Sequence, residues 1–195
     1  MNKLTSKGTA ALGAVTNTIA TVKRRWHLAL AAIFAISSTV AFATPPSGIV
    51  PAPETMVLAR GTFENPTDIK LKIKTAHGNE VINVNNAQQT VVQKITIAPG
   101  GNTGWHSHPG PVVVVIAQGT MSFYDGDDPT CTRGTYTVGQ AFVDSGQGHV
   151  HIARNEGFEN LVLLATYFDV PPIIPGVPGS GAFRIDAANP GTCAF

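Results

Sequence analysis

Two pairs of histidines in the sequence have a spacing that suits metal binding. His106 and His108 are separated by one residue, and so are His149 and His151. In a β-strand, residues i and i+2 point to the same face, so each pair can direct both imidazoles at one place. Two such strands brought together inside a barrel would supply three or four imidazoles, a set that suits Zn, Cu, Fe, Ni or Mn. The spacing therefore predicts a transition-metal site.

The segments that must position these histidines have the pattern of short β-strands. After residue 55, apolar stretches rich in Val, Ile, Thr and aromatic residues alternate with turn-forming stretches such as 98–104. No stretch of ten or more residues in this region has a 3.6-residue period. About eight closely spaced strands predict an all-β sandwich, barrel or jelly roll. The expected strands are 56–60, 68–74, 91–97, 111–118, 120–124, 140–144, 149–153 and 161–168.

The region around the first histidine pair resembles the first sequence motif of the cupins, G-x5-H-x-H-x3-E-x6-G. Residues 100–119, GGNTGWHSHPGPVVVVIAQG, match every anchor of the motif except one, because Val112 stands where the family has glutamate. Trp105 precedes the first histidine and should point away from the metal face, into the core or the rim. The matching anchors are Gly100, His106, His108 and Gly119.

Residues 139–155, GQAFVDSGQGHVHIARN, resemble the second cupin motif, G-x5-P-x-G-x2-H-x3-N, less closely. Gly148, His151 and Asn155 fit its ending, whereas Ser145 takes the place of proline and the segment before it is one residue longer. His151 is accordingly the expected third ligand, and His149 is the fallback or an extra ligand. The resemblance covers about residues 91–168.

The resemblance implies a double-stranded β-helix, a conical jelly-roll barrel whose interior holds a metal on His106, His108 and His151. Without the glutamate, the metal would keep more positive charge and up to three open positions. Three-histidine cupins include Fe(II)-dependent dioxygenases, so one hypothesis is a ferrous oxidoreductase of this type acting on a small molecule, with Zn, Mn, Cu and Ni also open. The opposing hypothesis is a non-catalytic small-molecule-binding or structural cupin module. A third is a site that has lost its function.

Few other side chains in the sequence are candidates for chemistry, and no catalytic residue is assigned. Tyr124 and Gln118 are the nearest candidates for acid–base work, with strand packing or surface placement as the alternative for both. Asp125, Asp127 and Asp128 surround an Asp-Gly pair that favours a solvated hairpin turn over a calcium site.

The first 43 residues have the pattern of a targeting segment. A basic region ending in Arg24-Arg25 precedes an apolar run of about 15 residues and then Ala41-Phe42-Ala43, a small-residue cleavage site. We expect cleavage before Thr44, by the general or the twin-arginine route, and export to the periplasm or the medium. The alternative is an uncleaved membrane anchor over residues 26–43, although a spanning helix needs roughly 20 apolar residues.

The remaining residues divide into a Pro-rich linker (44–55), the cupin barrel (56–170) and a Pro/Gly-rich tail (171–195). The tail is expected to be irregular and to lie over the surface.

The basic residues are unevenly distributed along the chain. Residues 1–43 hold five of the 13 Lys and Arg residues and no acidic residue. Residues 44–195 hold the other 8 basic residues and all 12 acidic residues, so their net charge is −4. This balance excludes nucleic acid as an expected partner. A membrane is a partner only through an uncleaved N-terminal segment. A homodimer stays open, with 68–74 as a candidate sheet edge.

The two cysteines of the sequence, Cys131 and Cys193, are candidates for a disulfide. An oxidising compartment outside the cytoplasm permits such a bond, which would tie the tail back to the barrel. The alternative is two unrelated buried thiols.

Overall fold

β-Strands make up the regular structure of the residues that the computed structural model describes, which are 42–75 and 78–195. These residues belong to one unit, Thr39–Phe195. The predicted targeting segment lies outside the described residues, apart from its last two positions. Within the described ranges, none of the chain forms a helix long and apolar enough to span a membrane.

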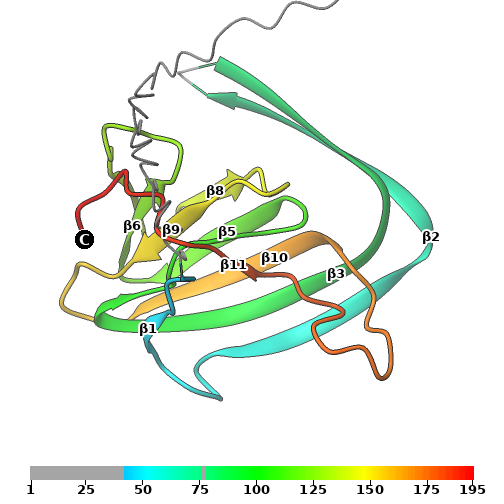
Figure 1. Cartoon of the computed structure of the whole chain (residues 1–195), viewed down its shortest axis with the longest axis horizontal. Helices are drawn as coiled ribbons and strands as arrows, with labels where there is room; N and C mark the ends of the chain where they lie inside the picture. Colours follow the sequence, from blue (N-terminus) through cyan, green and yellow to red (C-terminus); the bar gives the residue numbers. More distant parts are fainter. Residues whose placement is uncertain (1–41, 76–77) are drawn as a thin grey trace, which may run out of the picture. The chain divides into compact units, whose positions relative to one another are not determined.

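All strand pairs are antiparallel, and the strands form one sheet that curls into a nearly closed barrel (Figure 1). The main path of the sheet runs β11-β4-β9-β3-β10-β5-β8, with β1 and β2 beside β3, and β6 and β7 continuing from β9. The predicted all-β jelly-roll class is therefore confirmed. The strands are β1 (Ser47–Ile49), β2 (Met56–Thr75), β3 (Gly78–Asn102), β4 (His106–Ser107), β5 (Val112–Gln118), β6 (Thr120–Asp125), β7 (Gly134–Thr137), β8 (Ala141–Asp144), β9 (His151–Arg154), β10 (Leu161–Val170) and β11 (Ile185–Asp186).

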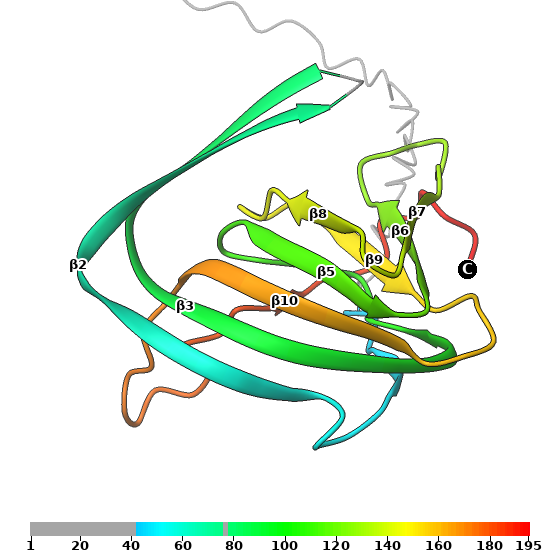
Figure 2. The same ribbon diagram turned by 180° about the vertical axis from the view of Figure 1, so that it is seen from behind.

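The longest strands, β2 and β3, form a hairpin whose far end extends past the other strands (Figure 2). Two segments expected as separate strands, 56–60 and 68–74, are joined in β2 by a region of shifted register between Thr62 and Ile69. The expected alternation of 68–74 is present, because Ile69, Leu71 and Ile73 pack inward while the lysines between them are exposed.

The interior of the barrel is filled by alternate residues of its strands. Val112, Val114 and Ile116 of β5 are buried, and so are four alternate residues of the neighbouring β10. Burying each such aliphatic side chain stabilises the fold by roughly 1.5–3 kcal/mol. The β10 residues in this core are Leu161, Leu163, Ala165 and Tyr167.

The C-terminal tail is tied to the barrel at several points. Cys131 and Cys193 form the predicted disulfide. β11 pairs with β4, and the N–H of Ala187 donates to the carbonyl of Trp105 at 2.9 Å. Trp105 is buried in a separate core cluster with Tyr124, Ile152 and Cys193, which is the core placement expected of it. The tail is therefore an ordered part of the structure.

The disulfide closes a loop of 62 residues and should contribute strongly to stability. We expect the double variant Cys131→Ser/Cys193→Ser to lose about 4 kcal/mol of unfolding free energy, because a closed loop of this length restricts the unfolded chain. Urea denaturation of both proteins measures the difference. Wild type in a reductant should match the variant, and equal stability of oxidised wild type and variant would contradict the prediction.

Candidate metal centre

The pairing of β4 with β9 brings the two histidine motifs together. His106 and His151 are direct partners in this pair, so their side chains project from the same face. His108 follows two residues later and turns to the same place. The ring centroids are 4.8 Å apart for His106 and His108, 4.5 Å for His106 and His151, and 5.2 Å for His108 and His151. All three side chains are buried, and they form a group that could hold a metal ion.

Backbone carbonyls determine which ring nitrogens of two histidines face the centre. The Nδ1–H of His106 donates to the carbonyl of Gly104 at 2.8 Å, and that of His108 donates to the carbonyl of Phe183 at 2.7 Å. A carbonyl can only accept, so the proton of each neutral ring lies on Nδ1. The Nε2 lone pairs are therefore left to bind a metal, the arrangement usual for ligating histidines.

A buried carboxylate, Asp144, lies beside the third histidine and was missed by the sequence reasoning. Its Oδ1 atom is 3.5 Å from Nδ1 of His151. Asp144 Oδ2 and His151 Nδ1 are buried polar atoms without a hydrogen-bond partner among the described residues. A carboxylate at this position can orient the imidazole through Nδ1 and direct Nε2 towards the centre. The strand containing Asp144 was expected, but its register was not visible in the sequence.

Asp144 also lies opposite Val112, the residue that the sequence resemblance aligns with the motif glutamate. In the β5–β8 pair, Val112 and Asp144 are direct partners, so both side chains face the interior. Val112 itself is buried in the barrel core. A negative charge is thus present beside the histidine group, supplied from the adjacent strand.

Burial determines the protonation of the three clustered histidines. Burial lowers the pKa of His106 well below 6.5, and the positive charges of Arg184 and of His108 act in the same direction. Burial likewise lowers the pKa of His108 and, more strongly, that of His151. Neutral imidazole is the form that binds metals, so the group is poised for ligation near neutral pH.

His149 lies outside the three-histidine group. β9 begins at His151, and the N–H of His149 donates to the carbonyl of Gly146 in the preceding turn. The rule for alternate strand residues therefore does not apply to this pair. Both ring nitrogens of His149 face carboxylates, Nδ1 with Asp144 at 3.1 Å and Nε2 with Asp125 at 2.8 Å. The hydrogen bond with Asp144 raises the pKa of His149 to about 9, against the effect of burial and with the help of Asp125.

The hydrogen bond between His149 and Asp144 also keeps the Asp144 carboxylate ionised. Burial by itself acts to raise the pKa of Asp144, but the hydrogen bond from His149 and the neighbouring histidines outweigh it, so the pKa is lowered. His149 and Asp144 thus form an ion pair through Oδ1, the same carboxylate oxygen that lies 3.5 Å from Nδ1 of His151.

A close contact between two loops holds the motifs in place. Gly146 has a φ of 63°, and a Cβ on this residue would collide with the carbonyl of Gly110, just after His108. The N–H of Gly148 donates to the carbonyl of His108 at 3.2 Å. Only glycine satisfies both the backbone conformation and the space at position 146. The Asn155 side chain, also buried, donates to the carbonyls of Ile97 and Glu159.

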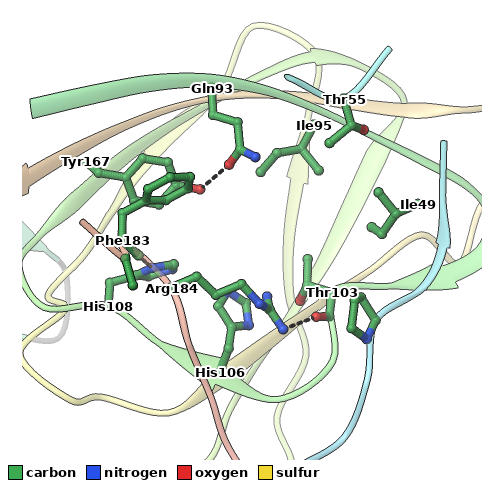
Figure 3. A pocket seen from close by; sticks show the side chains of 12 residues that line it. Ile49, Thr55, Gln93, Ile95, Thr103, His106, His108, Tyr167, Phe183 and Arg184 are labelled. Carbon is green, nitrogen blue, oxygen red and sulfur yellow. Dashed lines mark hydrogen bonds between the residues drawn. The ribbon is translucent and has the colours of Figure 1, made fainter. Parts of the chain in front are cut away.

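Two adjoining cavities lead to the histidines. The inner one is small, about 40 Å³, and is lined by all three rings together with Val112 and Asp144. The outer one has a volume of about 310 Å³ and an apolar wall (Figure 3). Twelve residues line it: Pro46, Ile49, Thr55, Gln93, Ile95, Thr103, His106, His108, Tyr167, Ala182, Phe183 and Arg184.

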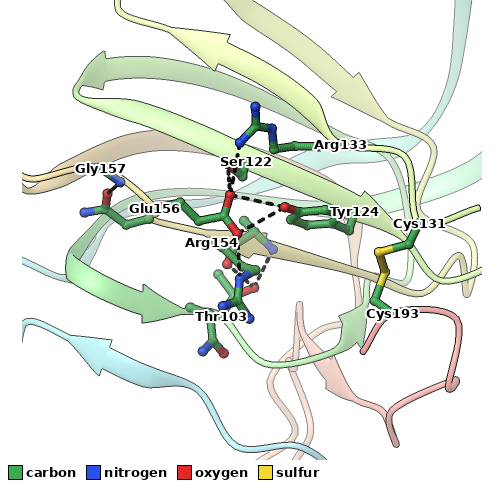
Figure 4. A network of polar contacts seen from close by, with 12 residues as sticks. Thr103, Ser122, Tyr124, Cys131, Arg133, Arg154, Glu156, Gly157 and Cys193 are labelled. Atoms are coloured by element: carbon green, nitrogen blue, oxygen red, sulfur yellow. Dashed lines mark hydrogen bonds and ion pairs between the residues drawn. A yellow bond between two sulfur atoms is a disulfide. The ribbon is translucent and has the colours of Figure 1, made fainter. Parts of the chain in front are cut away.

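The other candidates from the sequence lie away from these cavities. Tyr124 donates to Glu156 at 3.0 Å in a polar network near the disulfide (Figure 4). Gln118 is exposed and donates to Glu159 at 3.3 Å. The N–H of Asp127 donates to the Asp125 carboxylate, as in a hairpin turn.

The identity of the fold follows from the position of the histidines in the barrel. An antiparallel jelly-roll barrel contains His106, His108 and His151 on its inner face, at the positions of the two motifs. It is a cupin fold. The predicted architecture is thus confirmed, whereas the correspondence of Val112 to the motif glutamate stays an interpretation of the sequence.

Comparisons with known proteins give partial structural likenesses to cupins. No family model and no curated protein matches the chain. A Klebsiella pneumoniae protein with a double-stranded β-helix domain is similar at 18% identity over 62% of this chain and 84% of its own, with a TM-score of 0.39. A cupin domain from Bordetella pertussis is similar at 20% identity over 54% of this chain and 97% of its own, with a TM-score of 0.36. A cupin-like protein from Thermotoga maritima is similar at 25% identity, with a TM-score of 0.36. The matched region covers 40% of this chain and about half (55%) of that protein.

The protonation states of the histidines predict a maximum of stability near pH 6.5 in metal-free protein. The clustered histidines have lowered pKa values, so their contribution is lost as the pH falls below 6.5. His149 has a raised pKa, so its contribution is complete below 6.5 and is lost as the pH rises through about 9. Urea denaturation across this range tests both limbs. His149→Gln should flatten the alkaline limb, and an unchanged alkaline limb in this variant would contradict the assignment.

Proposed function

We propose that this protein is an exported cupin that binds one divalent transition metal ion through His106, His108 and His151. The observation that carries the proposal is the convergence of three buried imidazoles, two of which have Nδ1 held by a carbonyl. Buried histidines with lowered pKa values and free Nε2 atoms suit a metal better than a proton.

A metal bound here would supply a Lewis-acid or redox centre with positions open to a small molecule. Apolar side chains, among them Val112, Val114 and Leu163, line the inner cavity beside the histidines. The inner cavity also adjoins an outer one large enough for a small ligand. These features support a three-histidine oxidoreductase of the Fe(II) dioxygenase type as the catalytic form of the proposal, and Zn, Mn, Cu or Ni fit the same ligand set.

A non-catalytic binding module is the second candidate, and one feature of the cavities favours it. Of the described residues that line the inner cavity, Asp144 alone has a carboxylate, and it is already paired with His149. The hydroxyl of Tyr167 donates to Gln93 at 2.9 Å, and burial raises its pKa far above its usual range. Neither group is free to transfer a proton near neutral pH. Turnover would therefore depend on the metal and the ligand.

The disulfide supports export as part of the proposal. Disulfides such as Cys131–Cys193 form and persist in oxidising compartments and are rare in the cytoplasm. Fusion of residues 1–43 to a reporter that is active only outside the cytoplasm tests this part, and an inactive reporter would contradict it.

Replacing two of the ligands should remove the metal without unfolding the barrel. We expect the double variant His106→Ala/His108→Ala to retain less than a tenth of an equivalent of metal, because one imidazole cannot hold a divalent ion tightly. Elemental analysis of protein purified without a metal-binding tag measures the content, and circular dichroism verifies the fold. His149→Ala is the matched control and should keep its metal. Full occupancy in the double variant would place the site elsewhere.

The identity of the metal then separates the two candidates. Near one equivalent of iron, with oxygen uptake in the presence of thiols or diketones, would support the oxidoreductase. Another metal, or tight ligand binding without turnover, would support the binding module.

Removing the charge beside His151 should weaken metal binding while leaving the site assembled. We expect Asp144→Asn to bind metal about 10–100-fold more weakly, because residues that orient a ligating histidine typically have effects of this size. Competition with a chelating dye measures the affinity. Asp125→Asn, which alters the contacts of Asp125 with His149 and with the Asp127 N–H but leaves the Asp144 carboxylate in place, is the control and should change the affinity less than threefold. Equal affinities of Asp144→Asn and wild type would show that Asp144 does not act on the site.

A further inference from the structure

We infer that the outer cavity binds the carboxylate of a small organic acid, with Arg184 as the anion-binding group. This inference rests on the proposed function in one respect, because the cavity opens onto the histidines that would hold the metal. Binding of the acid itself needs no metal and can be measured in its absence.

The guanidinium of Arg184 is fixed at the wall of the cavity. Its Nη2 donates to the carbonyl of Thr103 at 2.6 Å, and its Nε donates to Asp186 at 2.7 Å. Figure 3 shows the group between His106 and Thr103, along the cavity edge. Among the described residues no acceptor is bonded to Nη1. Both N–H groups of Nη1 are therefore left for a ligand, on a side chain that is already held by two hydrogen bonds.

The cavity around Arg184 lacks a compensating charge. Among the described residues, no acidic side chain lines the outer cavity, and Arg184 is the one permanently charged residue of the twelve that do. Asp186 neutralises part of the charge from outside the cavity, where its side chain is 52% exposed. A guanidinium facing an apolar cavity favours a carboxylate over a neutral group.

The remaining walls indicate what kind of acid would fit. Ile49, Ile95 and Phe183 supply apolar surface, and the Phe183 ring lies 4.7 Å from that of Tyr167. A volume of about 310 Å³ is at the small end of the range for ligand pockets. The ligand class is therefore a small carboxylic acid with an apolar or aromatic body.

Contacts of the C-terminal tail restrict the motion of the Arg184 guanidinium. The carbonyl of Phe183, next to Arg184, accepts the hydrogen bond from His108. The carbonyl of Gly181 accepts one from Arg60 at 2.6 Å, and the disulfide holds the end of the tail. Such ordering before binding reduces the entropic cost of capturing a ligand. The same segment thus orients one metal-site histidine and supplies the anion-binding group.

Benzoate and its neutral counterpart benzamide are suitable probes for the test. Calorimetric titration of the metal-free protein should show benzoate binding at least tenfold more tightly than benzamide, because a hydrogen bond from a charged donor discriminates to this extent. Arg184→Gln should lose about tenfold or more in benzoate affinity and less than threefold in benzamide affinity. Arg133→Gln, which removes an exposed arginine outside the cavity, is the matched control and should change neither.

Equal affinities of wild type for the two probes, or no binding of benzoate at millimolar concentration, would overturn the inference without any variant. Unchanged benzoate affinity in a folded Arg184→Gln would do the same. If Arg184→Gln does not fold, Arg184→Lys keeps the charge and should still prefer benzoate over benzamide.

Metal uptake, measured on separate portions of the same preparations after incubation with divalent metal ions, separates this inference from the proposed function. Arg184-dependent benzoate binding in a protein that takes up no metal would support the anion site and contradict the metal site. One equivalent of metal with no preference for benzoate would do the reverse.

Discussion

The arrangement of the site depends on one backbone pairing, that of β4 with β9. Because His106 is directly opposite His151, a two-residue strand is enough to bring ligands from segments 45 positions apart to one face. His108 follows by the alternation of extended backbone. The loops on either side are packed so closely that position 146 must be glycine, which fixes the register of the two motifs. The apolar core of the barrel packs beside this contact.

The charges around the histidines alternate with neutral rings. The three clustered rings are neutral through burial, Asp144 is anionic beside His151, and His149 is cationic and contacts the same Asp144 oxygen. If Val112 replaces a ligating glutamate, the negative charge has moved to the neighbouring strand and away from direct coordination. A metal would then keep more of its own charge and more open positions. Such a centre suits anionic ligands, in agreement with the guanidinium of Arg184 in the outer cavity.

The C-terminal tail contributes both to the stability of the fold and to the histidine site. Its disulfide with Cys131 and its pairing with β4 hold a segment that has little regular structure of its own. That segment carries the Phe183 carbonyl, which orients His108, and the Arg184 side chain. The first described residues also contribute to the outer cavity. β1 lies within the expected linker and pairs with β3, and its residue Ile49 lines this cavity. Both ends of the described chain therefore complete a cavity that the central strands leave open.

The sequence by itself determined the features that depend on local spacing. Alternating apolar residues predict strands such as β5 and β10, the two-residue spacing of His106 and His108 predicts that their rings converge, and two cysteines in a chain expected to be exported predict a disulfide. Tertiary structure decided the features that depend on register and on where strands begin. Asp144 lies beside His151 because of its pairing partner, His149 lies outside the three-histidine group because β9 starts two residues later, and Arg184 belongs to a segment without periodicity. No local pattern encodes these contacts, since each is set by the packing of residues far apart in the chain.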